Sequence, residues 1–165
     1  MYNCGHKKGS PTVLLLVFIT SFFLNSMYAQ ELVNTAKDKK TYKVFLSKQD
    51  SDFKNEVVEE LKLNSDDINF KVTELSALKD LKIEEWDAIV ILHSWEFLSP
   101  PRVVKRFIRA NTSNKKKIVV LTTSSDGDAK MDEVDAITGE SELVDAYEYA
   151  YIITERLNKV FARAN

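Results

Sequence analysis

The sequence predicts an α/β protein with a parallel sheet of four to five strands and helices on both faces. The first observation is that short apolar runs alternate with helical patterns from Thr41 onward, as they do in parallel-sheet proteins. The second is that the runs "AIVIL" and "IVVL" are apolar at every position, which suits central strands covered on both faces. The third is that "INFKVTE" alternates apolar and polar residues, as a strand at the sheet edge does.

The first 29 residues have the features of a secretory signal peptide. Lys7 and Lys8 precede a 12-residue apolar run from Val13 to Leu24, and a polar segment then ends in "NSMYA". A membrane span needs about 20 apolar residues, so an uncleaved anchor is the less suitable alternative. We expect cleavage after Ala29, although the bulky Met27 leaves the exact bond open. The protein is therefore expected to be exported, periplasmic or secreted, with no membrane span after cleavage.

About 136 residues follow the signal peptide, which suffices for one domain. The polar segment 30–40 reads as a linker, and residues 41–165 form the predicted domain. Cleavage removes Cys4, the only cysteine, so a disulfide, a thiolate metal site and a cysteine nucleophile are all excluded. It also removes two lysines and no acid, which leaves 21 basic against 25 acidic residues. This charge balance argues against a nucleic-acid partner.

The first half of the domain contains three predicted strands. "YKVFLS" (42–47) is the first, and either Asp50 or Ser51 is expected to cap the helix that follows. "INFKVTE" (68–74) is the second, and a weak helical turn at 76–81 leads to the third, "WDAIVILH" (86–93). The helix after the first strand is predicted to bury Phe53, Val57, Val58 and Leu61 on one face.

In the second half, Ser99 is expected to cap a helix that has Pro100 at its first position. The predicted buried stripe of that helix comprises Val103, Val104, Phe107 and Ile108. "IVVLTT" (118–123) is the fourth strand, and "EVDAIT" (133–138) is either a short fifth strand or a structured loop. The last helix is expected to start near Ser141, with Leu143, Tyr147, Ala150, Ile153, Leu157 and Phe161 on one side.

Right-handed crossovers and the edge character of the second strand favour the strand order 2-1-3-4, with the short segment at the far edge. In that order the second strand lies on one side of the first strand and the third strand lies on the other, so a topological switch falls between the first and third strands. Open α/β sheets bind ligands beyond the carboxyl ends of their strands at such a point. The candidate loops are therefore residues 47–52, 93–99 and 122–128.

The stretch "WDAIVILHSWEFLSPPRVVKRFIRANTSNKKKIVVLTTSSDGD" resembles the flavodoxin-like proteins, and the resemblance extends over 42–161. It implies a flavodoxin-like three-layer sandwich with the order 2-1-3-4(-5), and FMN as the possible cofactor. By position in that family, Trp95 would stack on the flavin ring, with Ser94 before it. The loop after the fourth strand would line the other side of the ring through Thr123, Ser124, Asp126 and Gly127.

The loop after the first strand departs from that family, which usually holds the FMN phosphate in a glycine-containing turn rich in serine and threonine. Here the loop reads "SKQDSDFKN". Ser47 and Ser51 can donate to an anion, but Asp50 and Asp52 would repel it. The same acids have a simpler explanation as an N-cap and a first-turn charge that the helix dipole favours.

Other polar groups give weaker signals, each with a structural alternative. His93, the only histidine after the signal, is either a proton donor to a ligand or a hydrogen-bonded residue at a strand end. Glu96, Asp126 and Asp128 would suit a cation or acid–base chemistry, yet their spacing is unspecific and favours solvated loop acids. No G-x-S-x-G or G-x-G-x-x-G motif occurs. The basic residues Arg102, Arg106 and Arg109 form either a site for an acidic protein partner or a solvated helix face.

Two functions are consistent with these observations. The first is FMN-binding electron transfer or reductase-like chemistry, with the ring stacked on Trp95. The second is an exported, non-catalytic flavodoxin-like domain that has lost the cofactor and binds another small molecule or a protein. The departures in the first loop favour the second function, and whether the protein is an enzyme stays open.

Overall fold

The computed structural model describes residues 40–97, 99–131 and 133–164. The predicted signal peptide, and the predicted linker apart from Lys40, lie outside these residues. The fold described below is that of the compact unit Thr41–Asn165.

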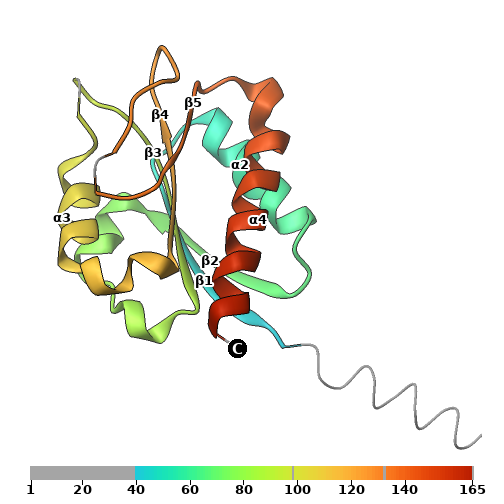
Figure 1. The fold of residues 1–165 in the computed structure, drawn as a ribbon. Coiled ribbons are helices and arrows are strands. Elements are labelled where there is room, and N and C mark those ends of the chain that lie inside the picture. Colours follow the sequence, from blue (N-terminus) through green and yellow to red (C-terminus); the bar gives the residue numbers. More distant parts are fainter. Residues whose placement is uncertain (1–39, 98, 132, 165) are drawn as a thin grey trace, which may run out of the picture. The chain divides into compact units, whose positions relative to one another are not determined.

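A five-stranded parallel sheet lies at the centre of this unit, in the order β2-β1-β3-β4-β5 (Figure 1). The predicted order is confirmed, and it is the order of the flavodoxin-like fold. β1 lies between β2 and β3, so the reversal of direction falls between the first and third strands, as predicted. The strands are β1 (Tyr42–Lys48), β2 (Ile68–Glu74), β3 (Ala88–Ser94), β4 (Ile118–Thr123) and β5 (Ile137–Gly139).

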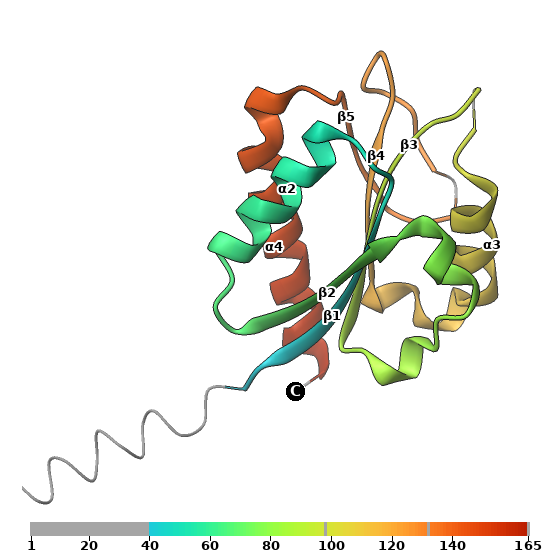
Figure 2. The same ribbon diagram turned by 180° about the vertical axis from the view of Figure 1, so that it is seen from behind.

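Helices cover both faces of the sheet, which gives three layers (Figures 1 and 2). On one face, α2 (Asp52–Leu63) and α4 (Ala146–Ala164) pack against the strands and against each other. On the opposite face lie α3 (Arg102–Ala110) and the 3₁₀ turns Leu75–Lys79, Ile83–Glu85 and Thr112–Lys117. The prediction of a three-layer α/β sandwich is therefore confirmed.

The sheet separates two apolar cores because successive strand residues point to opposite faces. Val90 and Leu92 of β3 belong to the core under α2 and α4, whereas Ile89 and Ile91 belong to the core under α3. All residues from Ala88 to Leu92 are completely buried. β2 instead alternates partly buried and exposed positions, in keeping with its place at the sheet edge. These burial patterns are those that the apolar and alternating sequence runs predict.

Two predicted helix starts are wrong. α3 begins at Arg102 after Pro101, with no side-chain cap, because the pyrrolidine of Pro101 disfavours helical backbone at Pro100. The hydroxyl of Ser99 instead donates to the Glu96 carbonyl at 3.4 Å. α4 begins at Ala146, after a 3₁₀ turn at Leu143–Asp145, and not near Ser141.

The prediction that Leu143 and Tyr147 lie on the buried side is also wrong, since their exposed fractions are 55% and 62%, and Tyr151 is likewise 60% exposed. The buried face of α4 contains Ala146 and Ala150, each one residue before an exposed tyrosine. Successive helical residues differ in direction by about 100°, so the tyrosines turn away from the sheet. The possible fifth strand is real but shorter and later than 133–138, because only Ile137–Gly139 pairs with β4. Within the described residues, no helix has the length and apolarity to cross a membrane.

Candidate functional site

The loops that follow β1, β3 and β4 are joined by hydrogen bonds at the carboxyl end of the sheet. The amide of Gln49 donates to the Leu92 carbonyl at 2.9 Å, and the side-chain oxygen of Gln49 accepts from the Ser94 amide, also at 2.9 Å. The Trp95 amide donates to the Thr123 carbonyl at 2.8 Å. The structure therefore brings together parts of all three predicted loops.

A chain of side-chain hydrogen bonds runs through this edge of the sheet. Lys54, in the first turn of α2, donates from Nζ to Ser94 Oγ at 2.7 Å. Ser94 Oγ lies 2.9 Å from Thr123 Oγ1, which also accepts a hydrogen bond from Ser141 Oγ at 2.8 Å. Lys54 and Thr123 are each 1% exposed, whereas Ser94 is half-buried. Four elements thus meet through one buried amine and three hydroxyls.

Lys54 has an unusual environment for a lysine. No carboxylate forms an ion pair with its Nζ among the residues that the structure describes. Burial, with the charge of Lys48 as a second cause, lowers the pKa of Lys54 from 10.5 to about 8. Sequence analysis missed this residue. The available signal was its spacing, because Lys54 shares the helical face of Val57, Val58 and Leu61 and must therefore be buried with them.

A pocket of about 320 Å³ opens beside the hydroxyl chain. Sequence analysis identified Ser94, Trp95, Thr123 and Ser124 in its wall, and missed the residues that the β5–α4 segment contributes. The backbone joins that segment to the site through the Ser124 amide, which donates to the Gly139 carbonyl at 3.1 Å. The complete lining is Ser94, Trp95, Thr123, Ser124, Ser125, Glu140, Ser141 and Glu142.

Trp95 lies in the wall of this pocket, and its side chain is only partly exposed. Its indole Nε1 is buried and has no hydrogen-bond partner among the described residues. Two residues later, Phe97 has a φ of 46° and is fully exposed, an uncommon conformation for a bulky side chain. The role of Trp95 as a platform for a flavin ring stays a prediction.

The loop after β1 does not fit the phosphate of FMN. Ser47 is completely buried, and its hydroxyl donates to the Glu74 carbonyl at 2.9 Å. Ser51 is the N-cap of α2, as predicted, and its Oγ accepts from the Lys54 amide at 3.3 Å. The Asp50 carboxylate is 89% exposed. The hydroxyl proton of Ser47 is therefore used within the fold, whereas Ser51 serves as an acceptor at the helix start, and phosphate binding by Ser51 stays a prediction.

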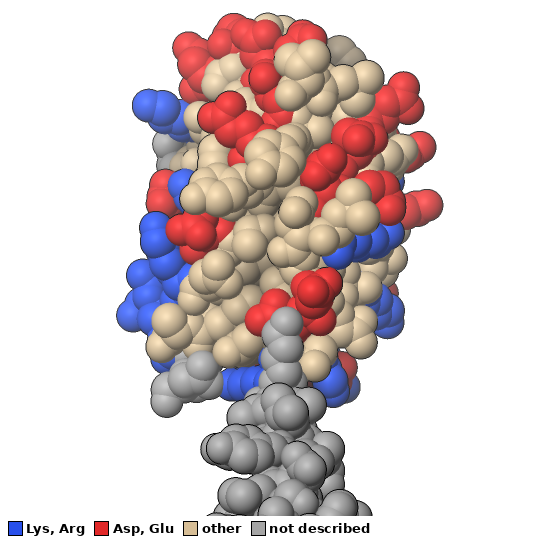
Figure 3. Space-filling view, turned by 90° about the vertical axis from the view of Figure 1, so that its right-hand side faces the viewer, with Lys and Arg blue, Asp and Glu red and all other residues tan. Residues whose placement is uncertain are grey.

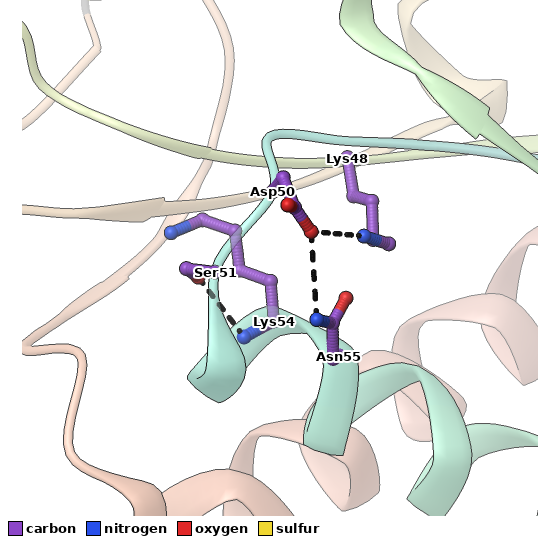
Figure 4. A network of polar contacts seen from close by, with 5 residues as sticks. All are labelled: Lys48, Asp50, Ser51, Lys54 and Asn55. Carbon is purple, nitrogen blue, oxygen red and sulfur yellow. Dashed lines mark hydrogen bonds and ion pairs between the residues drawn. The ribbon is translucent and has the colours of Figure 1, made fainter.

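Figure 4 shows how the side chains of this loop divide into two groups. The Asp50 carboxylate faces Lys48, with Oδ1 3.2 Å from Nζ, and accepts from Asn55 Nδ2 at 3.4 Å. The long side chain of Lys54 extends away from this group, and its Nζ bonds Ser94. Asp50 therefore neutralises Lys48, and Lys54 is left to the hydroxyl chain.

The loop after β4 is stabilised by its own side chains. Ser124 Oγ donates to Asp126 Oδ1 at 2.7 Å, and this hydrogen bond lowers the pKa of Asp126. Gly127 has a φ of 69°, a left-handed conformation that glycine adopts without strain, and its amide donates to the Ser124 carbonyl at 3.4 Å. Asp126 and Gly127 lie outside the pocket lining, and their hydrogen bonds give them a turn-forming role; contact of either residue with a ligand stays a prediction.

His93 is buried below the site and takes no part in it. Its side chain is completely buried, with Nδ1 3.2 Å from the Ser94 carbonyl oxygen and Nε2 3.4 Å from the Met131 sulfur. Burial lowers the pKa of His93 to about 4, which keeps the ring neutral at pH 7. This environment favours the structural reading of His93.

The charged groups outside the pocket are distributed unevenly. On the face formed by α2 and α4, acidic side chains gather at the end of the molecule where the strands finish, the top of Figure 3. On α3, Arg109 is paired with Glu133 through NH2 and Oε1 at 2.7 Å, whereas Arg102 and Arg106 are exposed. Among the described residues, no three histidine, cysteine or acidic side chains form a group that could hold a metal ion.

Comparison with known proteins gives similarity in structure only. No protein-family profile matches the sequence, and no curated protein matches it. A flavodoxin from the domain Archaea is 14% identical, with a TM-score of 0.48, and the match covers 72% of this chain and 98% of the flavodoxin. General stress protein 14 of Treponema denticola, solved in complex with FMN, is 13% identical, with a TM-score of 0.44 and coverages of 72% and 99%.

A two-component response regulator from Cytophaga hutchinsonii is 17% identical, with a TM-score of 0.43 and coverages of 74% and 99%. The fold assignment rests on the strand order itself. A parallel five-stranded sheet in the order 2-1-3-4-5, with helices on both faces, gives this chain the flavodoxin-like fold.

Proposed function

We propose that this chain is a flavodoxin-like binding domain whose pocket receives a neutral or cationic polar small molecule, and that it does not hold FMN by its phosphate. One observation carries the proposal: Glu140 and Glu142 contribute to the pocket wall beside the serine and threonine hydroxyls. Carboxylates accept hydrogen bonds from hydroxyl and ammonium groups, and they repel phosphate. The exposed carboxylate of Asp50 acts in the same direction at the first loop.

The pocket suits a small polar ligand in size as well as in chemistry. Its volume of about 320 Å³ lies at the lower end of the range of roughly 300–1,000 Å³ that small-molecule sites occupy. Hydroxyls from β3, β4 and the β5–α4 segment face the same space, and the tryptophan supplies an apolar surface beside them. A ligand with hydroxyl groups on one side and a flat apolar surface on the other matches these walls.

A flavin is the second candidate, because Trp95 lies in the wall beside Ser94 and Thr123, where a ring would be expected from the family resemblance. In that case the protein would serve in electron transfer or as a reductase, with the ring on Trp95. The acidic wall then favours riboflavin, which is neutral, over FMN, which adds a phosphate. Riboflavin and FMN therefore form a pair of probes that differ only in the group in question.

The test is a titration of the purified protein with riboflavin and with FMN, followed by tryptophan fluorescence. The variant Trp86→Phe is used so that Trp95 is the sole tryptophan, since Trp86 packs on Phe45 at the other end of the sheet. We expect FMN to bind no more tightly than riboflavin, and about fivefold more weakly if the ring binds at all, from roughly 1 kcal/mol of repulsion per close charge pair in water.

Each outcome decides between the two candidates. If neither flavin quenches Trp95, the flavin candidate is removed and a non-flavin ligand is sought. If the ring binds, the double variant Glu140→Gln/Glu142→Gln should bring the FMN affinity up to that of riboflavin. The matched control is Glu155→Gln, because Glu155 is an exposed acid on α4 that does not line the pocket. Tighter binding of FMN than of riboflavin by the native protein would refute the proposal.

We also propose, from the sequence, that the protein is exported and that α3 binds an acidic protein partner. The signal-like N-terminus supports export to the periplasm or the medium. The exposed Arg102 and Arg106 support an acidic protein partner at α3, and the pairing of Arg109 with Glu133 reduces the charge available to that partner.

A further inference from the structure

The hydroxyl chain at the pocket has a chemical property that binding alone does not require. Lys54 Nζ lies 2.7 Å from Ser94 Oγ, and Ser94 lines the pocket while Lys54 is 1% exposed. A buried amine in contact with a pocket-lining hydroxyl is the arrangement of a base and its nucleophile. Lys54 has no carboxylate partner in the described part of the chain that would hold its charge in place.

Two proton orders along the chain differ in which group donates between Lys54 and Ser94, because each hydroxyl donates one hydrogen bond. When Lys54 is charged, it donates to Ser94, and Ser94 donates onward to Thr123. When Lys54 is neutral, its lone pair can accept from Ser94, the reverse of the direction that the structure gives, with Thr123 donating to Ser94 and Ser141 donating to Thr123. In the neutral state every hydroxyl proton is satisfied, and the Ser94 proton points at the amine that would remove it.

The surroundings of Lys54 increase the fraction of its neutral form near neutral pH, although the charged form still predominates below pH 8. Burial and the charge of Lys48 lower the pKa of Lys54 to about 8. Lys48 is itself paired with Asp50, and His93, on the adjoining strand, is neutral at this pH. Other charged groups at this edge of the sheet include Glu96, which accepts a hydrogen bond from Gln49, the pocket residues Glu140 and Glu142, and the acids Asp52, Glu74, Asp126 and Asp128 at the ends of neighbouring elements.

We propose that Ser94 is a nucleophile with Lys54 as its base, and that it accepts an acyl group from an activated carboxylic ester bound in the pocket. Ser94 Oγ attacks the carbonyl carbon, and its proton passes to Lys54 Nζ. The bond from the carbonyl carbon to the leaving oxygen breaks, and the departing alcohol or phenol takes the proton from Lys54. The products are acyl-Ser94 and the free alcohol, and no oxidant or metal takes part. This inference rests on the proposed function to the extent that both use the same pocket.

The test uses the purified protein and p-nitrophenyl acetate. Release of p-nitrophenol is followed by absorbance, and the acetylated residue is identified by peptide mass spectrometry. Alkaline hydroxylamine cleaves an ester at serine and leaves acetyl-lysine intact, which separates Ser94 from reactive surface amines. We expect an ester at Ser94 whose rate of formation rises with pH to a plateau, with a midpoint near the Lys54 pKa of about 8.

Two pairs of variants test the assignment. Lys54→Met should slow acetylation of Ser94 by about a hundredfold, the usual contribution of a positioned general base. Lys62→Met, on the exposed side of the same helix, should change nothing. Ser94→Ala should abolish the hydroxylamine-sensitive label, and Ser113→Ala, an exposed serine far along the chain, should retain it. If Lys54→Met does not fold, the pH profile of the native protein decides in its place.

Acetylation of Ser94 at an equal rate in Lys54→Met, or a label confined to hydroxylamine-resistant lysines, would overturn the inference. Failure of the pocket as a binding site would show separately in the flavin titration, which involves no covalent step. The two tests can also give opposite answers. If Ser94 forms a Lys54-dependent ester but FMN binds more tightly than riboflavin, Ser94 is still the nucleophile and the proposed ligand class is wrong.

Discussion

At the scale of single residues, the two buried bases near the site have opposite relations to the hydroxyl chain. Lys54 joins it through Ser94 Oγ, whereas His93 contacts only the Ser94 carbonyl and the Met131 sulfur. Burial lowers the pKa of both residues, so the folded state resists protonation of each. The buried charge of Lys54 lowers the free energy of unfolding. This loss is fully present below about pH 8 and disappears as the pH rises toward 10.5.

For His93, we predict a loss of stability in acid. Its pKa is about 4 in the folded protein and 6.5 when unperturbed, so the unfolded chain binds the additional proton between these values. The free energy of unfolding should therefore fall as the pH drops from 6.5 to 4, by up to about 3 kcal/mol at the acid end. Urea unfolding at pH 7 and pH 4.5 measures this loss.

The variant His93→Gln isolates the effect from that of the carboxylates, which also titrate in acid. It keeps a polar side chain near the Ser94 carbonyl and removes the titrating ring. We expect its free energy of unfolding to depend less on pH than that of the native protein over this window. The same pH dependence in both proteins would show that His93 does not titrate between these values.

At the scale of the elements, the short strand β5 is decisive for the site, because the segment that follows it contributes Glu140, Ser141 and Glu142 to the pocket. β5 ends at Gly139, which is buried against Tyr149 of α4. Tyr149 in turn packs edge to face on Phe53 of α2, with ring centroids 5.6 Å apart. The absence of a side chain at Gly139 therefore lets α4 lie close to the end of the strand.

We predict that Gly139→Ala destabilises the protein by about 1–3 kcal/mol, the usual cost of overpacking. A Cβ at this position would collide with the Tyr149 hydroxyl and lie 2.5 Å from its Cζ. In the double variant Gly139→Ala/Tyr149→Ala, the loss in free energy of unfolding should be smaller than the sum of the losses in the two single variants, because the residues are in contact. Thermal or urea unfolding measures all three proteins, and strictly additive costs would contradict the contact.

At the scale of the whole molecule, the charge distribution supports the proposal that the pocket does not receive a phosphate. Acidic side chains gather at the carboxyl end of the sheet on the face shown in Figure 3. In an α/β sheet that end is the ligand-binding end. The general charge of the protein therefore acts in the same direction as the acidic pocket wall and the exposed Asp50.

The predicted signal peptide also concerns the whole chain. Expression of the complete sequence in a bacterium with a general secretion pathway should yield an exported protein whose N-terminus is Gln30. Edman sequencing or intact mass spectrometry of the exported fraction identifies that residue. Deletion of residues 13–24, the apolar run, is the control and should retain the protein in the cytoplasm. A chain that stays membrane-bound with its N-terminal lysines intact would refute cleavage.

The sequence by itself determined the layers, the parallel sheet and its order. The fully apolar runs of β3 and β4 and the alternating pattern of β2 suffice for this, because burial on one or both faces imposes those patterns directly. The end of the sheet that holds the pocket follows from the same order, as do the positions of Ser94, Trp95 and Thr123 at it.

Only the tertiary structure decided which polar groups meet there. Lys54 and Ser94 are 40 residues apart and Thr123 and Ser141 are 18 apart, and no local pattern encodes these pairings. Ser47 and Ser51 are plausible phosphate ligands by position, yet their hydroxyls are engaged by Glu74 and the Lys54 amide. Hydrogen-bond partners depend on where separate elements come together in space, and that is set by the packing of the whole domain.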